Sequence, residues 1–96
     1  MYILINKERD TDDSVAYRAT MNVPLSSYLS RSGKTRYKLE AKIGCFLYDK
    51  VNGELVFASD SDPYYLESEL VRFRCLWKMD QCREQGEFPD VVTWAS

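Results

Sequence analysis

Residues 62–85 are predicted to form one helix with two apolar stripes, where a surface helix of a small domain ordinarily has one. The first stripe has the i, i+4, i+7, i+11 spacing of a face about 60° wide and consists of Leu66, Leu70, Phe73 and Trp77. The second lies on roughly the opposite side and consists of Tyr64, Val71, Cys75 and Cys82, with Met79 at its margin. We expect the first stripe to face the core, so the second needs another surface to cover it.

Local signals at both ends support this helix. Asp62 is a suitable N-cap, and Pro63 fits the first helical position because the N–H that it lacks would have had no partner there. Gly86 is the residue type that most often ends a helix in the left-handed conformation, and Pro89 supports a stop soon afterwards. The helix is therefore expected to run from Asp62 to Gln85.

Three segments before the helix have strand patterns. Residues 2–6 are short and aliphatic. Residues 14–23 alternate, and Pro24 is expected to end a strand whose apolar row is Val15, Tyr17, Ala19, Met21 and Val23. Residues 36–49 alternate as well, with an expected inward row of Tyr37, Leu39, Ala41, Ile43, Cys45 and Leu47. The serine-rich residues 24–35 between them are interpreted as a connection with room for a short helix.

The remaining signals complete the predicted fold. Asn52-Gly53 favours the positive φ of a turn, so we expect a hairpin between 36–49 and a strand within 54–59, with a loop of two residues or longer. Val91 to Trp94 form either a last short strand or an apolar tail. The sequence predicts an α+β fold, in which an antiparallel sheet of four to five strands has one long C-terminal helix packed across one face. At 96 residues, the chain is expected to be a single domain, residues 1–96.

The composition argues against catalysis and against a strongly charged partner. The chain has no histidine, so the commonest general base and the commonest neutral metal ligand are missing. Its cysteines lack the C-x-x-C spacing of a zinc site, and Cys75 and Cys82 would lie about 10 Å apart along a helix, beyond disulfide reach. Basic and acidic residues nearly balance, 13 against 15. We expect a non-enzymatic protein with free thiols and with no metal or cofactor.

The same data bear on localisation. No apolar run approaches the ~18 residues of a membrane span, and the short apolar run at the N-terminus lacks the preceding positive charge of a signal peptide. Three cysteines, an odd number, also differ from the disulfide framework of small secreted domains. These features predict a cytoplasmic protein that does not bind membranes.

A local basic strip gives one alternative function. It is expected on the outward row of the 36–49 strand and in the loop before it, and comprises Arg31, Lys34, Arg36, Lys38 and Lys42. Such a strip could follow a phosphate backbone, or it could be a solvated sheet face that resists aggregation. The corresponding hypothesis is a nucleic-acid-binding accessory protein.

The second helical stripe gives the leading hypothesis. It is either a second core layer, covered by residues 24–35 or by the 91–94 segment, or a surface that contacts a partner protein or a second copy of the chain. Tyrosine and arginine beside the stripe fit the composition of interface hot spots. The expected contact residues are Tyr64, Tyr65, Val71, Arg72, Arg74, Cys75, Met79 and Cys82.

The small size and the order of a hairpin followed by a helix resemble histidine-poor proteins encoded by phages and mobile elements, and small bacterial immunity proteins. That resemblance implies a protein that binds and blocks a host enzyme or defence complex. The leading hypothesis is therefore a small inhibitor or regulator that acts by binding a host protein. A small structural or assembly subunit is a further alternative.

Overall fold

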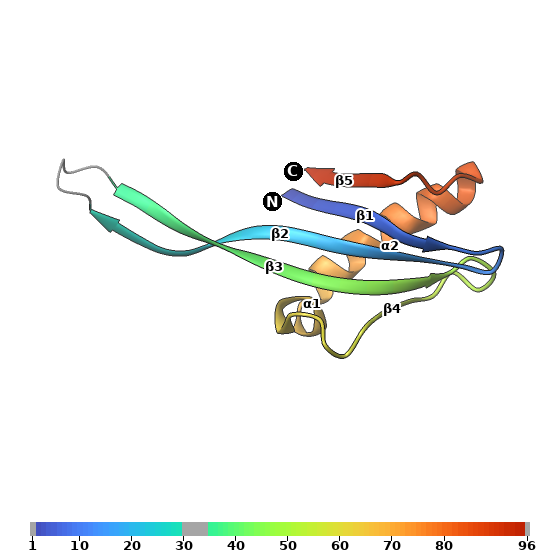
Figure 1. Ribbon diagram of the computed structural model, residues 1–96, viewed down its shortest axis with the longest axis horizontal. Coiled ribbons are helices and arrows are strands. Elements are labelled where there is room, and N and C mark those ends of the chain that lie inside the picture. The colour runs from blue at the N-terminus through green and yellow to red at the C-terminus, as the bar shows by residue number, and fades with distance from the viewer. Residues whose placement is uncertain (1, 30–34, 96) are drawn as a thin grey trace.

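The computed structural model describes the backbone of residues 2–29 and 35–95, and the side chains of residues 2–22 and 40–95. The elements, in chain order, are β1 (Tyr2–Asp10), β2 (Ser14–Leu29), β3 (Thr35–Asp49), β4 (Leu55–Phe57), α1 (Pro63–Glu67), α2 (Glu69–Gln85) and β5 (Val91–Ala95). All strand pairs are antiparallel, and they form one five-stranded sheet in the order β4-β3-β2-β1-β5. With α2 laid across one face of this sheet (Figure 1), the predicted α+β class is confirmed.

β2 and β3 form a hairpin that is longer than the rest of the sheet. Their pairing runs from Ser14 opposite Asp49 to Leu29 opposite Thr35, with a register shift between Pro24 and Ser26. The expectation of a strand end at Pro24 is therefore wrong, because the shift lets β2 pass a residue that has no N–H to donate. A connection with a short helix was expected for residues 24–35. Residues 24–29 belong to β2 instead, and residues 30–34 lie outside the described part.

Because of this hairpin the molecule is elongated. Its principal extents are 55 × 25 × 21 Å, and in Figure 1 the paired ends of β2 and β3 extend well past the other strands. The helices and the three remaining strands gather around the other half of the hairpin. Every described core residue lies in that half of the molecule.

The inward rows of the sheet were predicted correctly for β2 and wrongly for β3. Val15, Tyr17, Ala19 and Met21 are all buried, as expected. Cross-strand partners share a face, and Tyr17 lies opposite Phe46, so the inward row of β3 is Gly44, Phe46 and Tyr48. The expected inward residues Ile43 and Leu47 are instead 48% and 52% exposed on the other face, with Ala41 and Cys45 in the same row. The side chains of Val23, Tyr37 and Leu39, which belong to the two expected inward rows, are not described.

Gly44 makes room for the first helix. A Cβ atom at this position would lie 2.7 Å from Cδ2 of Tyr65, closer than any ordinary contact. The Tyr65 ring therefore rests directly on the β3 backbone, and its hydroxyl donates to the Lys42 carbonyl oxygen over 2.7 Å. This contact fixes α1 against the sheet.

The helical region has the predicted ends but is divided in two. The Asp62 carboxylate accepts from the Tyr64 N–H, Pro63 is in the first turn, and Gly86 ends α2 with φ of 73°. Ser68, with φ −91° and ψ 106°, ends α1 and caps α2, its side chain accepting from the Val71 N–H. A serine hydroxyl can offer the backbone this alternative to helical bonding, which explains the break within the expected continuous helix.

The last two elements of the sheet follow local signals. Gly53 has φ of 73° in the turn between β3 and β4, which confirms the predicted hairpin and the longer of its two loop options. Val91–Ala95 is a strand rather than a tail, and it pairs with β1 through Ile3 opposite Trp94 and Ile5 opposite Val92. The inward side of β5 therefore contains Val92 and Trp94.

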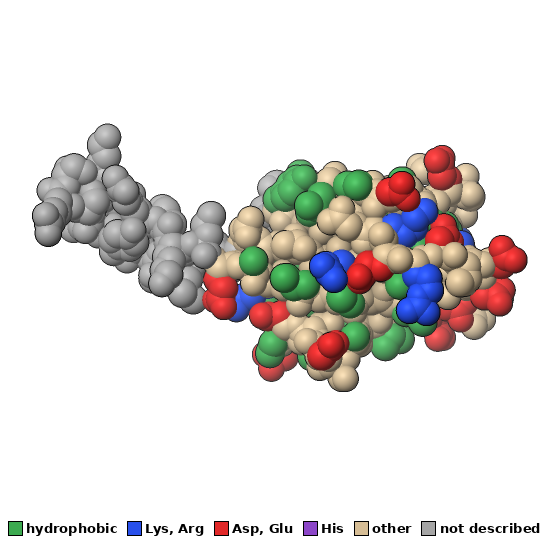
Figure 2. Space-filling model, viewed as in Figure 1, with side chains coloured by type: hydrophobic (Ala, Val, Ile, Leu, Met, Phe, Trp, Pro, Cys, Tyr) green, Lys and Arg blue, Asp and Glu red, His purple; other side chains and the backbone are tan. Residues whose placement is uncertain are grey.

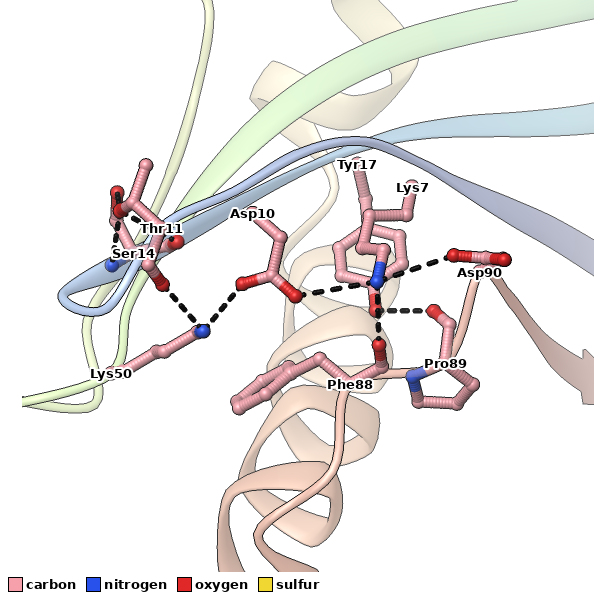
Figure 3. Close-up of polar contacts among 9 residues, drawn as sticks. All are labelled: Lys7, Asp10, Thr11, Ser14, Tyr17, Lys50, Phe88, Pro89 and Asp90. Carbon is pink, nitrogen blue, oxygen red and sulfur yellow. Dashed lines mark hydrogen bonds and ion pairs between the residues drawn. The ribbon is translucent and has the colours of Figure 1, made fainter.

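A polar network ties the turns at one end of the sheet to the segment between α2 and β5 (Figure 3). Lys7 Nζ contacts Asp10 Oδ2 and Asp90 Oδ1, each at 3.2 Å, and donates to the Phe88 carbonyl oxygen at 3.0 Å. Lys50 bonds the other oxygen of Asp10, and the buried Tyr17 hydroxyl donates to the Pro89 carbonyl oxygen over 2.6 Å. These contacts hold β5 in place after the helix ends.

Among the residues described, neither helix combines the length and the apolar character needed to cross a membrane.

Candidate functional site

Large apolar side chains are exposed on both helices. Leu66 of α1 is 38% exposed, and Leu70, Phe73 and Trp77 of α2 are 55%, 62% and 43% exposed. We refer to these four residues as the outer stripe. They are the residues that the sequence pattern predicted to face the core, and that prediction is wrong.

The opposite stripe forms the core instead. Val71, Cys75 and Met79 are fully buried and Cys82 nearly so. The inward face of the sheet presents large rings, among them Tyr17, Phe46 and Tyr48, and the residues of this stripe belong to the same core cluster as those rings. Helical periodicity identifies two opposed stripes but is unchanged when the helix is turned by half a revolution, so it does not say which of them meets the sheet.

The expected contact residues are therefore split between core and surface. Val71, Cys75, Met79 and Cys82 are buried in the core cluster together with residues of the sheet, and Tyr65 is buried as well. None of these five reaches a partner while the domain is folded. Of the other three, Arg72 is exposed, and Tyr64 and Arg74 are half-buried.

A tryptophan pair joins the outer stripe to the sheet. The Trp77 and Trp94 rings meet edge to face with centroids 5.2 Å apart. Arg74 and Lys78 lie over the Trp94 ring, at 5.4 and 5.6 Å from its centroid, and Lys78 also lies 5.7 Å from that of Trp77. Cation–π contacts of this kind hold long basic side chains beside an aromatic surface. The outer stripe thus has a basic border on the side of β5.

The other border contains charges of both signs around a small hollow. This hollow has a volume of about 280 Å³ and is lined by Leu55, Glu69, Arg72, Phe73 and Leu76. Its position next to the most exposed ring of the stripe gives a partner side chain a place to insert. Sequence reasoning did not find Trp94 or Leu55 as parts of this surface, because each comes from a strand whose position depends on tertiary pairing.

The basic strip predicted for nucleic acid is not assembled in the described residues. Lys42 is half-buried on the helix-covered face of the sheet, where its Nζ lies 3.2 Å from Glu40 and 3.8 Å from Asp62. Arg31 and Lys34 lie outside the described residues, and the side chains of Arg36 and Lys38 are not described. The one member of the strip with a described side chain is therefore paired with two carboxylates.

The three thiols are free, as predicted. Burial raises the pKa of Cys75 to about 12, so this thiol stays protonated at neutral pH. Burial also raises the pKa of Cys82. It is the largest of the causes that raise the pKa of Cys45, and the neighbouring Glu8 raises that pKa further. Across the described residues, no group of three or more histidine, cysteine or acidic side chains could hold a metal ion.

Comparison of the chain with protein-family models, with curated proteins and with solved structures finds no match. The proposals below therefore rest on the geometry of the chain itself.

Proposed function

We propose that this protein is a non-enzymatic binding module that holds a partner protein against the outer stripe of α2. The single observation that carries this proposal is the exposure of Leu70, Phe73 and Trp77 in one row on α2, with Leu66 of α1 exposed as well. Contiguous apolar surface of this kind usually marks an interaction site in a folded chain.

The stability of the domain does not account for the outer stripe. The opposite side of α2 already supplies the core, with Val71, Cys75 and Met79 fully buried. Complete burial of a side chain such as Phe73 is worth about 1.5–3 kcal/mol, a gain that the isolated chain largely forgoes at this position. A partner that covers the row would recover much of it.

The residues around the stripe support a protein partner. Tryptophan and arginine are over-represented among residues that dominate binding energy, and here Trp77 and Arg74 border the same surface. The helix presents its apolar side chains at i, i+3 and i+7 from Leu70, which suits a groove or a second helix on the partner. Arg72 and Glu69 at the rim would set the orientation of that partner.

Within this proposal the protein is an inhibitor or regulator. A small chain whose recognition surface is one helix face affects its partner chiefly by covering part of that partner's surface. The resemblance to small proteins of phages and mobile elements implies the same mode of action. In this proposal the protein acts on a host protein in the cytoplasm. The alternative, a nucleic-acid-binding role, rests on the basic strip, in which Lys42 is paired with Glu40 and Asp62 and the other four side chains are not described.

A matched pair of variants tests the proposal in quantitative pull-downs. Phe73→Asp places a charge in the stripe, while Val51→Asp places one in the β3–β4 turn at a residue of nearly equal exposure, 63% against 62%. We expect a partner to be retained at high salt by the wild-type protein and by Val51→Asp, and to be lost from Phe73→Asp. Equal retention by Phe73→Asp would contradict the proposal, and nucleic acid that elutes steeply with salt would favour the alternative.

A further inference from the structure

The face of the sheet opposite α2 has no covering element in the described chain, yet several of its strands have the composition of buried strands. A strand with one solvated face alternates between apolar and polar residues, whereas a strand covered on both faces is a continuous apolar run. Residues 2–5 of β1, 43–48 of β3 and 55–57 of β4 are such continuous runs. The pattern of these three strands favours a cover over their outward sides, whereas the outward row of the central strand β2, with Arg18, Thr20 and Asn22, is polar.

The exposed side chains on this face agree with that inference. Tyr2, Ile43, Leu47, Val56 and Val91 are between 48% and 66% exposed, and all of them point away from α2. Figure 2 shows hydrophobic side chains distributed over this face, while most of the acidic groups lie at its margins. A hollow of about 600 Å³ near Ala16, Leu47 and Val56 leaves room for an inserted apolar side chain.

The charges near the middle of the face identify the occupant. β2 is the central strand, and its Arg18 Nη2 lies 3.3 Å from Oε2 of Glu8 on the neighbouring β1, with both side chains about half exposed. A two-fold axis brings the same patch of two copies together, so such an interface must be complementary to itself. The Arg18–Glu8 pair meets this requirement where the axis passes between the two side chains, because a rotated copy then sets its Glu8 against Arg18 and its Arg18 against Glu8. Arg9, which is paired with Ala16, is a further exposed cation on the same face.

The available area is sufficient for such a dimer. Five strands about 4.8 Å apart and about seven residues of about 3.3 Å each give a face of roughly 550 Å² per copy. The total of roughly 1,100 Å² passes the ~1,000 Å² expected of a specific interface and lies near the lower end of the usual range. Two sheets with the same twist also stack well face to face, about 10 Å apart.

We infer that a second copy of this chain covers the outer sheet face, with the Arg18–Glu8 pairs of the two copies facing each other across a two-fold axis. This dimer leaves the outer stripe of α2 free on both copies, since α2 lies on the other side of the sheet. The inference is thus independent of the proposed function, and Phe73→Asp is expected to lose a partner while remaining a dimer.

Charge reversal tests the dimer by sedimentation velocity and light scattering over a range of concentrations. The wild-type protein is expected at twice the chain mass of 11.2 kDa. Arg18→Glu or Glu8→Arg alone sets like charges together and is expected to raise the dimer dissociation constant at least tenfold. The double variant restores the dimer, and an equimolar mixture of the two single variants forms a heterodimer.

Controls separate this interface from general charge effects. Arg72→Glu and Glu84→Arg make the same changes at exposed positions on α2 and are expected to leave the mass unchanged. Circular dichroism checks that each variant is folded. A wild-type protein that stays monomeric at about 1 mM overturns the inference, and so does a dimer whose dissociation constant is unaffected by Arg18→Glu.

A thiol reagent gives an independent readout on the unmodified protein. Cys45 is paired with Arg18 across β2 and β3 and is the partly exposed thiol, while Cys75 and Cys82 are buried. Dimer formation would cover Cys45, so its rate of alkylation is expected to rise on dilution through the dissociation constant. A rate independent of protein concentration, in samples that sediment as dimers, would place the interface elsewhere and overturn the inference.

Discussion

The Trp94 ring packs edge to face on the Trp77 ring, with centroids 5.2 Å apart and planes inclined by 80°. One tryptophan comes from the last strand and the other from the outer stripe of α2, so the pair links the sheet edge to the candidate contact surface. Arg74 and Lys78 border the same rings. The surface is therefore held in place by packing at its β5 side.

The two tryptophans should differ in their effects on stability. Trp94 is half-buried on the inward side of β5, beside core residues, whereas Trp77 is 43% exposed. We expect Trp94→Ala to lower the free energy of unfolding by about 2–3 kcal/mol, and Trp77→Ala by about 1 kcal/mol or less. Urea unfolding followed by circular dichroism measures both. Equal losses would show that the pair is not divided between core and surface as described.

Gly44 should tolerate no larger residue. Because an added Cβ would lie 2.7 Å from the Tyr65 ring, Gly44→Ala must displace α1 or the strand, and we expect a loss of about 1–3 kcal/mol. Gly86→Ala provides a contrast, since no atom lies within 4 Å of its would-be Cβ and only the positive φ opposes the change. If Tyr65→Leu does not relieve part of the Gly44→Ala loss, the assigned contact is wrong.

Acid should weaken the network around Asp10. The hydrogen bond from Lys50 is the largest of the causes that hold the pKa of Asp10 below its ordinary 3.8, and Lys7 contributes further. A depressed pKa means that the carboxylate stabilises the fold above pH 3.8 and that this stabilisation is lost as the pH falls through the lower folded value. Asp10→Asn should therefore be destabilising at pH 5–7 and nearly neutral well below pH 3.8. Asp12→Asn in the same turn removes a carboxylate that lies outside this network and is the control.

Local sequence signals were sufficient to predict several ends of helices and strands, but not which side of α2 and of β3 is buried. Asp62-Pro63, Gly86 and Asn52-Gly53 each act within a few residues, and the structure has a cap, a helix end and a turn where they predict them. The inward row of β2 could also be predicted from the sequence, because the alternate residues of this strand include the polar Arg18, Thr20 and Asn22.

The errors arose where both faces of an element are apolar. Residues 43–48 of β3 and both stripes of α2 have no polar row to mark solvent, so only pairing with β2 and packing against its rings decide the orientation. Ser68 and Pro24 show a related limit. The expected helix includes Ser68 as an interior residue, but its hydroxyl bonds the Val71 N–H and divides the helix. Pro24 is expected to end a strand, but pairing with β3 continues on both sides of it.

The orientation of α2 is the central claim, because it decides which stripe is free to bind a partner. Leu70 and Val71 are adjacent residues on opposite sides of the helix, 55% and 0% exposed. The most direct measurement is the free energy of unfolding of Leu70→Asp and Val71→Asp in parallel. We predict a loss within about 1 kcal/mol for Leu70→Asp, and a loss of more than about 3 kcal/mol or failure to fold for Val71→Asp. The reverse order, with Leu70→Asp unfolded and Val71→Asp stable, would contradict the claim.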